Sequence, residues 1–240
     1  QKDLKAELDP PAHFRSRRLS KIGAAWLSPR ECNMTSGANS PTPPARTSAE
    51  EVTIPEAKVS VYEALYRRRM AWQFKDRQVP RETLERMLAT AVWAPNHRLT
   101  EPWRFFVLEK GGEARTKAAD LAYEFSMGRN NNPARAETAR RAVLDPPVVV
   151  YIYCVPGPND EVTKENYGAV CCAAHNVSLA GVAEGLAVTW ETGGVTRHPK
   201  LRQVLGAQAD WQMAVMLSIG APAATPTSSR TEVSHFVNWV

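Results

Sequence analysis

The hydrophobic pattern of the chain changes character near Val59. Before that point, residues 1–58 carry seven prolines, scattered polar residues and no sustained apolar period, which is typical of a disordered leader or linker. Beyond it, periodic segments follow one another to the C-terminus. The pattern predicts one folded domain over residues 59–240, and we expect residues 1–33 to be either upstream or non-native sequence that adds nothing to function.

Two amphipathic helices are predicted at the start of this domain. The first runs from about Val59 toward a group of arginines, with Val61 and Leu65 repeating at helical spacing. The second begins near Pro80 and is expected to end at Pro95, because proline rarely continues a helix. Its apolar residues fall at offsets of three, four, seven and eight from the first: Leu84, Met87, Leu88, Ala91 and Val92.

Four segments have the composition of strands. Residues 147–155 are almost continuously apolar, as a central strand covered on both faces would be. Shorter apolar runs predict strands at residues 103–108, 187–190 and 213–219. Between them we expect helices after Gly111-Gly112 and over residues 160–184 and 199–205, and a mobile loop over the site at residues 127–133. The pattern predicts an α+β fold with helices around one sheet.

The helix at residues 160–184 and the C-terminal tail both indicate a partner subunit. This helix is apolar nearly all round, so it must be buried on more than one side. The tail, residues 221–240, contains Phe236 and Trp239 close to its end, and contact across a dimer would bury these aromatic side chains. We therefore expect a homodimer.

The formal net charge of +5 does not by itself indicate a nucleic-acid partner. Residues 1–33 hold seven Lys or Arg against four Asp or Glu, so three of the five excess charges lie in the leader. Outside Arg67, Arg68 and Arg69, the sequence has no basic stripe with stacking or base-reading groups. We expect a small-molecule partner and no nucleic acid.

The cysteines and the longest apolar stretch bear on location. The four cysteines follow neither a disulfide nor a zinc pattern, which is typical of a reducing cytoplasm: Cys32, Cys154, Cys171 and Cys172. Cys171 and His175 lie four residues apart, but no further ligand completes a set, so we expect no metal. Residues 169–187 are interrupted by two polar residues and a glutamate, and we expect no membrane span.

Two short stretches carry the candidate chemistry: residues 67–74 (RRRMAWQF) and, one helix later, residues 94–105 (APNHRLTEPWRF). Guanidinium groups suit a phosphate, because their planar fork gives paired, charge-assisted hydrogen bonds. Three arginines at a helix end are equally explained by the negative end of the helix dipole. The second stretch has the pattern of a helix stop, a polar loop and a strand entry, where a planar cofactor can be held.

In this order and at this separation, the two stretches resemble the start of the FMN-dependent nitroreductase family. A third stretch, residues 185–194 (GLAVTWETGG), is similar to the strand-to-loop passage that runs along the flavin in that family. The resemblance covers roughly residues 59–240 and is closest to the small YdjA-like subgroup. It implies an α+β nitroreductase-like fold, with a central, mainly antiparallel sheet flanked by helices and a C-terminal extension swapped across a homodimer.

The resemblance also implies the residues around the cofactor. Arg68, Arg69 and Met70 fall at the phosphate-side positions after the first helix, and Arg230 falls in the second basic cluster. Trp190, Glu191 and Thr192 belong to the passage beside the flavin ring, where a backbone N–H points at N5 and no particular side chain is required.

In the YdjA-like subgroup, residues at the positions of Trp93 and His97 reach the flavin of the opposing subunit. His97 is therefore the candidate catalytic residue, contributed by the partner subunit, and can act by hydrogen bonding or by proton donation. Considered without the resemblance, a solvated loop histidine explains it equally well.

Three residues depart from the family pattern. Met70 stands where serine is common, Trp72 where a basic residue often meets the flavin pyrimidine, and Leu99 where many members have asparagine. Either the geometry of the YdjA-like subgroup applies, or the affinity for flavin is reduced.

The implied activity is that of an NAD(P)H oxidoreductase. Hydride would pass from NADH or NADPH to N5 of FMN, and in a second half-reaction to a nitroaromatic, a quinone or an activated alkene. The sequence has no glycine-rich dinucleotide fingerprint, so the nicotinamide would stack on the flavin. Two alternatives stay open: a related flavin reaction, such as reductive dehalogenation or a specialised dehydrogenation, and a flavin-binding protein without turnover. The sequence sets neither the physiological oxidant nor the choice between NADH and NADPH.

Overall fold

The computed structural model describes residues 52–56, 58–224 and 226–240. The helices and strands described here belong to the compact unit Ile54–Val240. The disordered leader predicted over residues 1–58 lies for the most part outside the described residues.

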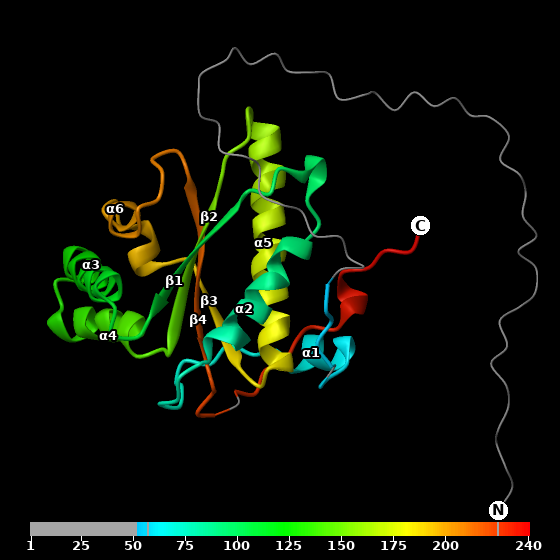
Figure 1. Ribbon diagram of the computed structural model, residues 1–240, viewed down its shortest axis with the longest axis horizontal. Helices are drawn as coiled ribbons and strands as arrows, with labels where there is room; N and C mark the ends of the chain where they lie inside the picture. The colour runs from blue at the N-terminus through cyan, green and yellow to red at the C-terminus, as the bar shows by residue number, and fades with distance from the viewer. Residues whose placement is uncertain (1–51, 57, 225) are drawn as a thin grey trace, which may run out of the picture. The chain divides into compact units, whose positions relative to one another are not determined.

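One antiparallel sheet forms the centre of the second unit, with its strands in the order β1-β2-β4-β3 (Figure 1). Its strands are β1 (Trp103–Glu109), β2 (Val148–Cys154), β3 (Ala187–Glu191) and β4 (Gln212–Gly220). All seven residues of β2 are buried, as the continuous apolar run predicted. The four predicted strands and the predicted α+β class are confirmed.

Helices cover both faces of this sheet. The long helix α5 runs along one face, and α3, α4 and α6 lie on the other (Figure 1). The helices are α1 (Val61–Arg67), α2 (Arg81–Ala89), α3 (Glu113–Asn130), α4 (Pro133–Leu144), α5 (Asp160–Ala183) and α6 (Leu201–Leu205). Short 3₁₀ turns follow at η2 (Ala91–Trp93), η3 (His97–Leu99), η4 (Gly194–Arg197) and η5 (Val233–His235). Among the described helices, none is both long and apolar enough to cross a membrane.

Two local predictions were wrong. The second helix ends at Ala89, ahead of Pro95, because the chain tightens there into the 3₁₀ turn η2. The expected mobile loop at residues 127–133 is instead a tight connection between α3 and α4. Asn131 ends α3 in the left-handed conformation, with φ 44°, and the Asn132 side chain accepts a hydrogen bond from the Arg135 N–H to begin α4.

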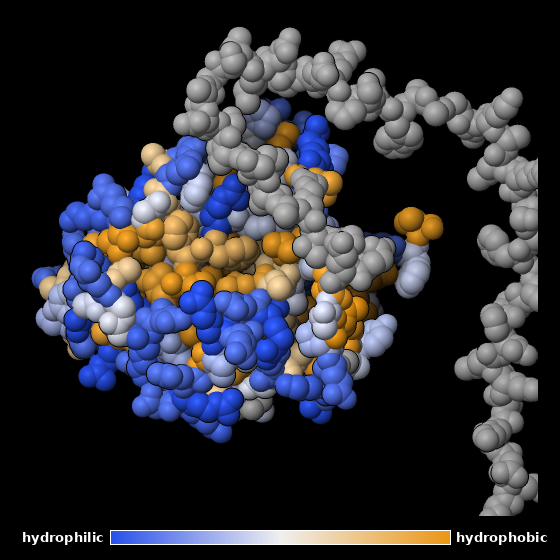
Figure 2. All heavy atoms as spheres, viewed as in Figure 1, coloured by the Kyte–Doolittle hydropathy of each residue, from blue (hydrophilic) through white to orange (hydrophobic). Residues whose placement is uncertain are grey.

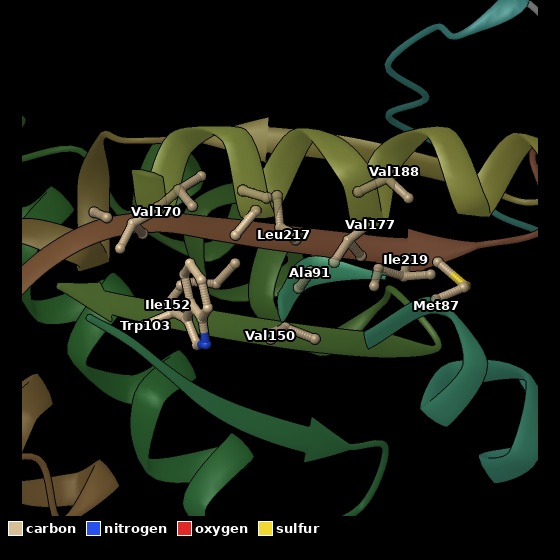
Figure 3. Close-up of a cluster of buried hydrophobic side chains, with 14 of the residues drawn as sticks. Met87, Ala91, Trp103, Val150, Ile152, Val170, Val177, Val188, Leu217 and Ile219 are labelled. Atoms are coloured by element: carbon tan, nitrogen blue, oxygen red, sulfur yellow. The ribbon is translucent and has the colours of Figure 1, made fainter. Parts of the chain in front are cut away.

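The core on the α5 side is built from aliphatic side chains of the helix and the sheet (Figure 3). Val170 and Val177 of α5 pack toward Leu217 and Ile219 of β4. Near the end of the helix, Gly181 allows close approach to β3: a Cβ at this position would lie 2.7 Å from Cγ2 of Val188. This contact fixes the distance between α5 and β3.

The core on the other face contains a buried arginine. The Arg115 guanidinium of α3 donates hydrogen bonds to four backbone carbonyls, those of Leu108, Val143, Leu144 and Pro146. Burial lowers the pKa of Arg115 to about 10. Because these carbonyls lie at the ends of β1 and α4, the side chain holds α4 in place beside β3 and β4, where the candidate site lies.

Candidate functional site

The arginine-rich stretch lies against strand β3. The backbone N–H of Ala71 donates to Oγ1 of Thr189 at 3.1 Å, and the same hydroxyl donates to the carbonyl of Ala71 at 2.6 Å. Thr189 is fully buried. One threonine therefore attaches residues 67–74 to the strand that leads into the glycine loop.

A second contact continues this attachment beyond β4. The Lys75 N–H donates to the Ala221 carbonyl at 2.8 Å, and the Ala223 N–H donates to the Gln73 carbonyl at 3.0 Å. Phe74 pairs with Pro222 in an antiparallel bridge. The first and third of the sequence stretches are thus brought together, although more than a hundred residues separate them in the chain.

Two neighbouring cavities open where these segments meet. One, of about 410 Å³, is bounded by the end of β3, the loop that follows it and the helices α3 and α4. The other, of about 320 Å³, lies between residues 71–74, β3, β4 and α4. Trp72, Ala142 and Glu191 line both. Together they have the size of a site for a small organic molecule, and we call them the β3 cavities.

The carboxyl group of Glu191 contributes to the shared wall. The hydroxyl of Ser218 donates to Oε1 of Glu191 at 3.1 Å. Burial raises the pKa of Glu191 above its ordinary value of 4.5, and the hydrogen bond from Ser218 opposes this in part. The site therefore contains a carboxyl group whose neutral form is favoured by its surroundings.

Trp190 and Glu191 lie on opposite faces of β3. Trp190 packs against the core on the α5 side, whereas Glu191 faces α4 and Ser218. Pairing of β3 with β4 ends at Glu191. The backbone of Thr192, Gly193 and Gly194 then borders the larger cavity. The sequence-predicted residues 190–192 are thus together at one site.

The three consecutive arginines have separate surroundings. Arg67 pairs with Glu63 on its own helix at 2.6 Å. The Arg69 guanidinium donates to the Tyr66 carbonyl at 2.7 Å and to the Arg68 carbonyl at 2.8 Å. The helix-end role that the sequence left open is therefore the one that Arg69 fills.

Arg68 and Met70 are both partly buried. The Arg68 cation lies close enough to His175 of α5 to lower the pKa of that imidazole, together with the larger effect of partial burial. Arg68 therefore lies toward α5. Among the described contacts, the side chains of Arg67 and Arg69 bind a carboxylate or backbone carbonyls, whereas that of Arg68 binds neither.

His97 lies in a loop that is fixed to the start of α5. Its Nδ1 is 3.1 Å from Oε1 of Glu165, and Nε of the neighbouring Arg98 is 3.5 Å from Oε2 of the same carboxylate. The His97 side chain is 65% exposed, and Trp93 in η2 is 47% exposed. Neither residue lines the β3 cavities of its own chain.

Arg230 is exposed, and its side chain donates to Ser228 and to the Ser229 carbonyl. Arg230 is not among the residues that line the β3 cavities. The structure thus gathers residues 71–72 and 189–194 in one place, and leaves His97, Trp93 and Arg230 elsewhere on the surface.

Sequence reasoning missed several residues that build this site. Two hydroxyl residues of ordinary-looking strands, Thr189 and Ser218, were not predicted, and neither was Glu165, which contacts His97. Helix α4 also forms a cavity wall that the sequence did not predict, with Thr138, Ala139, Arg141 and Ala142. A polar residue inside an apolar strand, as at Thr189, is the one local signal available, because a buried hydroxyl needs a partner.

Comparison with known proteins gives the family. The model of the nitroreductase family matches residues 65–221. A protein of Escherichia coli (strain K12) named as an NAD(P)H nitroreductase, YdjA, is 26% identical over 168 residues, which cover 70% of this chain and 91% of YdjA. Human iodotyrosine deiodinase 1 is 26% identical over 180 residues, which cover 69% of this chain and 62% of the deiodinase.

Solved structures share the fold. A nitroreductase-like protein from Bacillus cereus superimposes with a TM-score of 0.69 and 25% identity, over 78% of this chain and 99% of that one. A nitroreductase from Desulfovibrio desulfuricans in complex with FMN superimposes with a TM-score of 0.60 and 21% identity, over 75% and 96% of the two chains. Since the family model matches well over half of the residues and all three stretches overlap it, this chain belongs to the nitroreductase family.

Proposed function

We propose that this protein is an FMN-dependent NAD(P)H oxidoreductase whose flavin lies beside β3. The observation that carries the proposal is the attachment of Ala71 to Thr189, because it holds residues 71–74 beside the glycine loop and the β3 cavities. The FMN complex of the Desulfovibrio desulfuricans protein and the name of YdjA support both the cofactor and the electron donor.

The residues present fit the parts of FMN. Trp72 and Met216 give the larger cavity an aromatic and apolar wall for a flat ring. Arg68 lines neither cavity and lies toward α5, so its guanidinium is proposed for a phosphate that extends beyond them. The backbone of residues 192–194, beyond the last pairing of β3, offers N–H groups for negative charge that develops on the ring.

When bound, FMN would supply a hydride acceptor at N5, so that hydride from NADH or NADPH could reduce a nitroaromatic, a quinone or an activated alkene in a second half-reaction. The protein holds the ring and shields it from water. The β3 cavities share one wall and open to solvent. We propose that the nicotinamide donor and the oxidant occupy the same space beside the flavin in turn.

A homodimer is part of the proposal. The described chain leaves large apolar side chains in water, among them Tyr62 at 76%, Tyr66 at 77% and Trp239 at 94% exposure. β1 is an edge strand, and hydrophobic side chains gather across the middle of the face in its region (Figure 2). We propose that the C-terminal segment of a second copy covers such surface and that the partner's Trp93 and His97 complete the site.

The decisive experiment uses the absorbance spectrum. The purified protein should retain FMN or bind it stoichiometrically, the flavin bands should bleach when NADH or NADPH is added without oxygen, and a nitroaromatic should restore them. Failure to bind FMN would overturn the proposal. Bound FMN that neither nicotinamide reduces would support the alternative of a flavin-binding protein without turnover.

A second candidate function is reductive dehalogenation on the same site, which the likeness to iodotyrosine deiodinase 1 favours. The test supplies a halogenated phenol to the protein after its flavin has been reduced chemically. Release of halide at a rate above that of nitro reduction would favour dehalogenation, and reduction of the nitro compound alone would exclude it for that phenol.

A further inference from the structure

The strongest group of polar contacts outside the β3 cavities lies between the His97 loop and α5. Three residues of this loop have positive φ: Arg98 at 64°, Leu99 at 50° and Glu101 at 47°. Residues other than glycine rarely adopt this conformation, and it persists only where the surroundings hold it. The loop must therefore be fixed by contacts that outweigh this strain.

The first set of contacts fixes the loop backbone. Oδ1 of Asn96 accepts from the Glu101 N–H at 2.7 Å, and its Nδ2 donates to Oγ1 of Thr100 at 3.0 Å. Thr100 in turn donates to Oδ1 of Asn166 at 2.6 Å, and the Asn166 amide donates to the Val155 carbonyl at 3.0 Å. Asn166 is buried, so the loop is connected to the protein interior.

The second set fixes the imidazole. Glu165, the residue before Asn166, has Oε1 3.1 Å from Nδ1 of His97, while Arg98 approaches Oε2 at 3.5 Å. The His97 contact lowers the pKa of Glu165, with smaller contributions from Arg98. The carboxylate is therefore ionised at neutral pH and can only accept a hydrogen bond, so the proton of a neutral imidazole must be on Nδ1.

We infer that Glu165 is a positioning residue for His97: it accepts the Nδ1–H of the ring and so leaves Nε2 as the nitrogen presented to the neighbouring subunit's flavin site. The inference rests on the proposed function, since His97 acts there across the dimer. It explains why two adjacent residues of one helix hold this loop, Asn166 through the backbone and Glu165 through the imidazole. A merely solvated histidine would not need the contact with Glu165.

The test reads the ring tautomer directly and needs no turnover. Long-range ¹H–¹⁵N spectra of the full, FMN-loaded protein, labelled at histidine and recorded where the His97 ring is neutral, are compared for the wild type, Glu165→Ala and Glu165→Gln. His97→Asn assigns the signal. Glu161→Ala is the matched control, because Glu161 is an exposed carboxylate of the same helix, one turn before Glu165.

We expect Nδ1–H in the wild type, a change toward the Nε2–H tautomer in Glu165→Ala, and retention of Nδ1–H in Glu165→Gln, whose amide oxygen still accepts. Turnover in Glu165→Ala should fall at least about tenfold with unchanged FMN occupancy, because a mispositioned group loses its alignment with the reacting atoms. Glu165→Gln should keep most of the activity, and Glu161→Ala should match the wild type.

An unchanged tautomer in Glu165→Ala would overturn the inference, and so would a changed tautomer with full turnover. Failure of the proposed function is a separate outcome: a protein that binds no FMN would still give the imidazole spectra. In that case, the same spectra of the flavin-free protein would still test whether Glu165 accepts the Nδ1–H of His97.

Discussion

Arg67, Arg68 and Arg69 are consecutive, yet their side chains do different work. Arg67 and Arg69 serve the end of α1, through Glu63 and the helix carbonyls, while Arg68 faces α5. The arginines considered alone favoured a helix-end role, and the resemblance to the family favoured phosphate binding. The choice between the two roles depends on the path of the chain after Arg67. That path is fixed by the hydrogen bond from Thr189, in the distant strand β3, to the Ala71 carbonyl.

This difference gives the first prediction. Arg68→Ala should weaken FMN binding by about 1.5–3 kcal/mol, the range for a hydrogen bond to a charged group. Arg67→Ala removes the same charge from the adjacent position and should leave affinity nearly unchanged, because its partner is Glu63. Fluorescence titration of flavin-free protein measures both. Equal losses in the two variants would assign the effect to overall charge and remove Arg68 from the site.

The second prediction concerns Glu191. Its pKa is raised by burial, so the stability that its neutral form contributes is complete below its ordinary pKa of 4.5 and is lost as pH rises through the folded-state pKa. Glu191→Gln keeps the acceptor for Ser218 and cannot ionise. The wild type should therefore lose stability relative to Glu191→Gln as pH increases above 4.5.

Urea unfolding at a series of pH values measures that difference. Glu161→Gln, at an exposed position, should follow the wild-type curve throughout. Parallel curves for the wild type and Glu191→Gln would mean that the carboxyl group is solvated in the folded protein and does not ionise differently on unfolding.

At the scale of elements, periodicity predicted most of the fold, because each strand and helix buries a face that its own residues define. The predicted strand at residues 147–155 and the observed β2 differ by one residue at each end. The prediction of a mobile loop between α3 and α4 was wrong, because three consecutive asparagines indicate a loop by composition. Asn131 and Asn132 instead end one helix and begin the next, a role that depends on backbone conformation.

The prediction at the scale of elements concerns the contact of Gly181 in α5 with β3. Gly181→Ala should destabilise the protein by about 1–3 kcal/mol, because the new methyl group would press on Val188 and on the end of Met87. The intrinsic gain in helix propensity, about 1 kcal/mol, works in the opposite direction and is smaller than an overpacked contact in a rigid core.

Gly128→Ala is the control for this substitution. It also lies inside a helix, α3, but nothing would lie within 4 Å of its Cβ, so it should stabilise the protein by about 0.5–1 kcal/mol. Thermal unfolding of both variants distinguishes the two signs. A stabilised Gly181→Ala would show that α5 and β3 can move apart without cost.

At the scale of the whole molecule, one chain brings together only part of the predicted site. Residues 71–72 and 189–194 meet at the β3 cavities, whereas Trp93, His97 and Arg230 stay apart from them. A single sequence predicts which residues a strand or helix buries, but a surface shared by two chains combines residues with no periodic relation to one another. The family resemblance supplied that part of the candidate site, and the exposed aromatic side chains are the physical feature consistent with it.

The tail offers the sharpest test of the dimer. Phe236 and Trp239 are 73% and 94% exposed in the single chain, and aromatic side chains at the centre of an interface each contribute on the order of 2 kcal/mol or more. Replacing both with serine should shift the protein from dimer to monomer in analytical ultracentrifugation and lower its FMN retention, because the partner's His97 and Trp93 would be lost from the site. Asn238→Ser alters the same tail without removing apolar surface and should remain dimeric. A wild-type monomer that retains FMN would show that the site is complete within one chain. A dimer that persists after both substitutions would show that the tail does not hold the two subunits together.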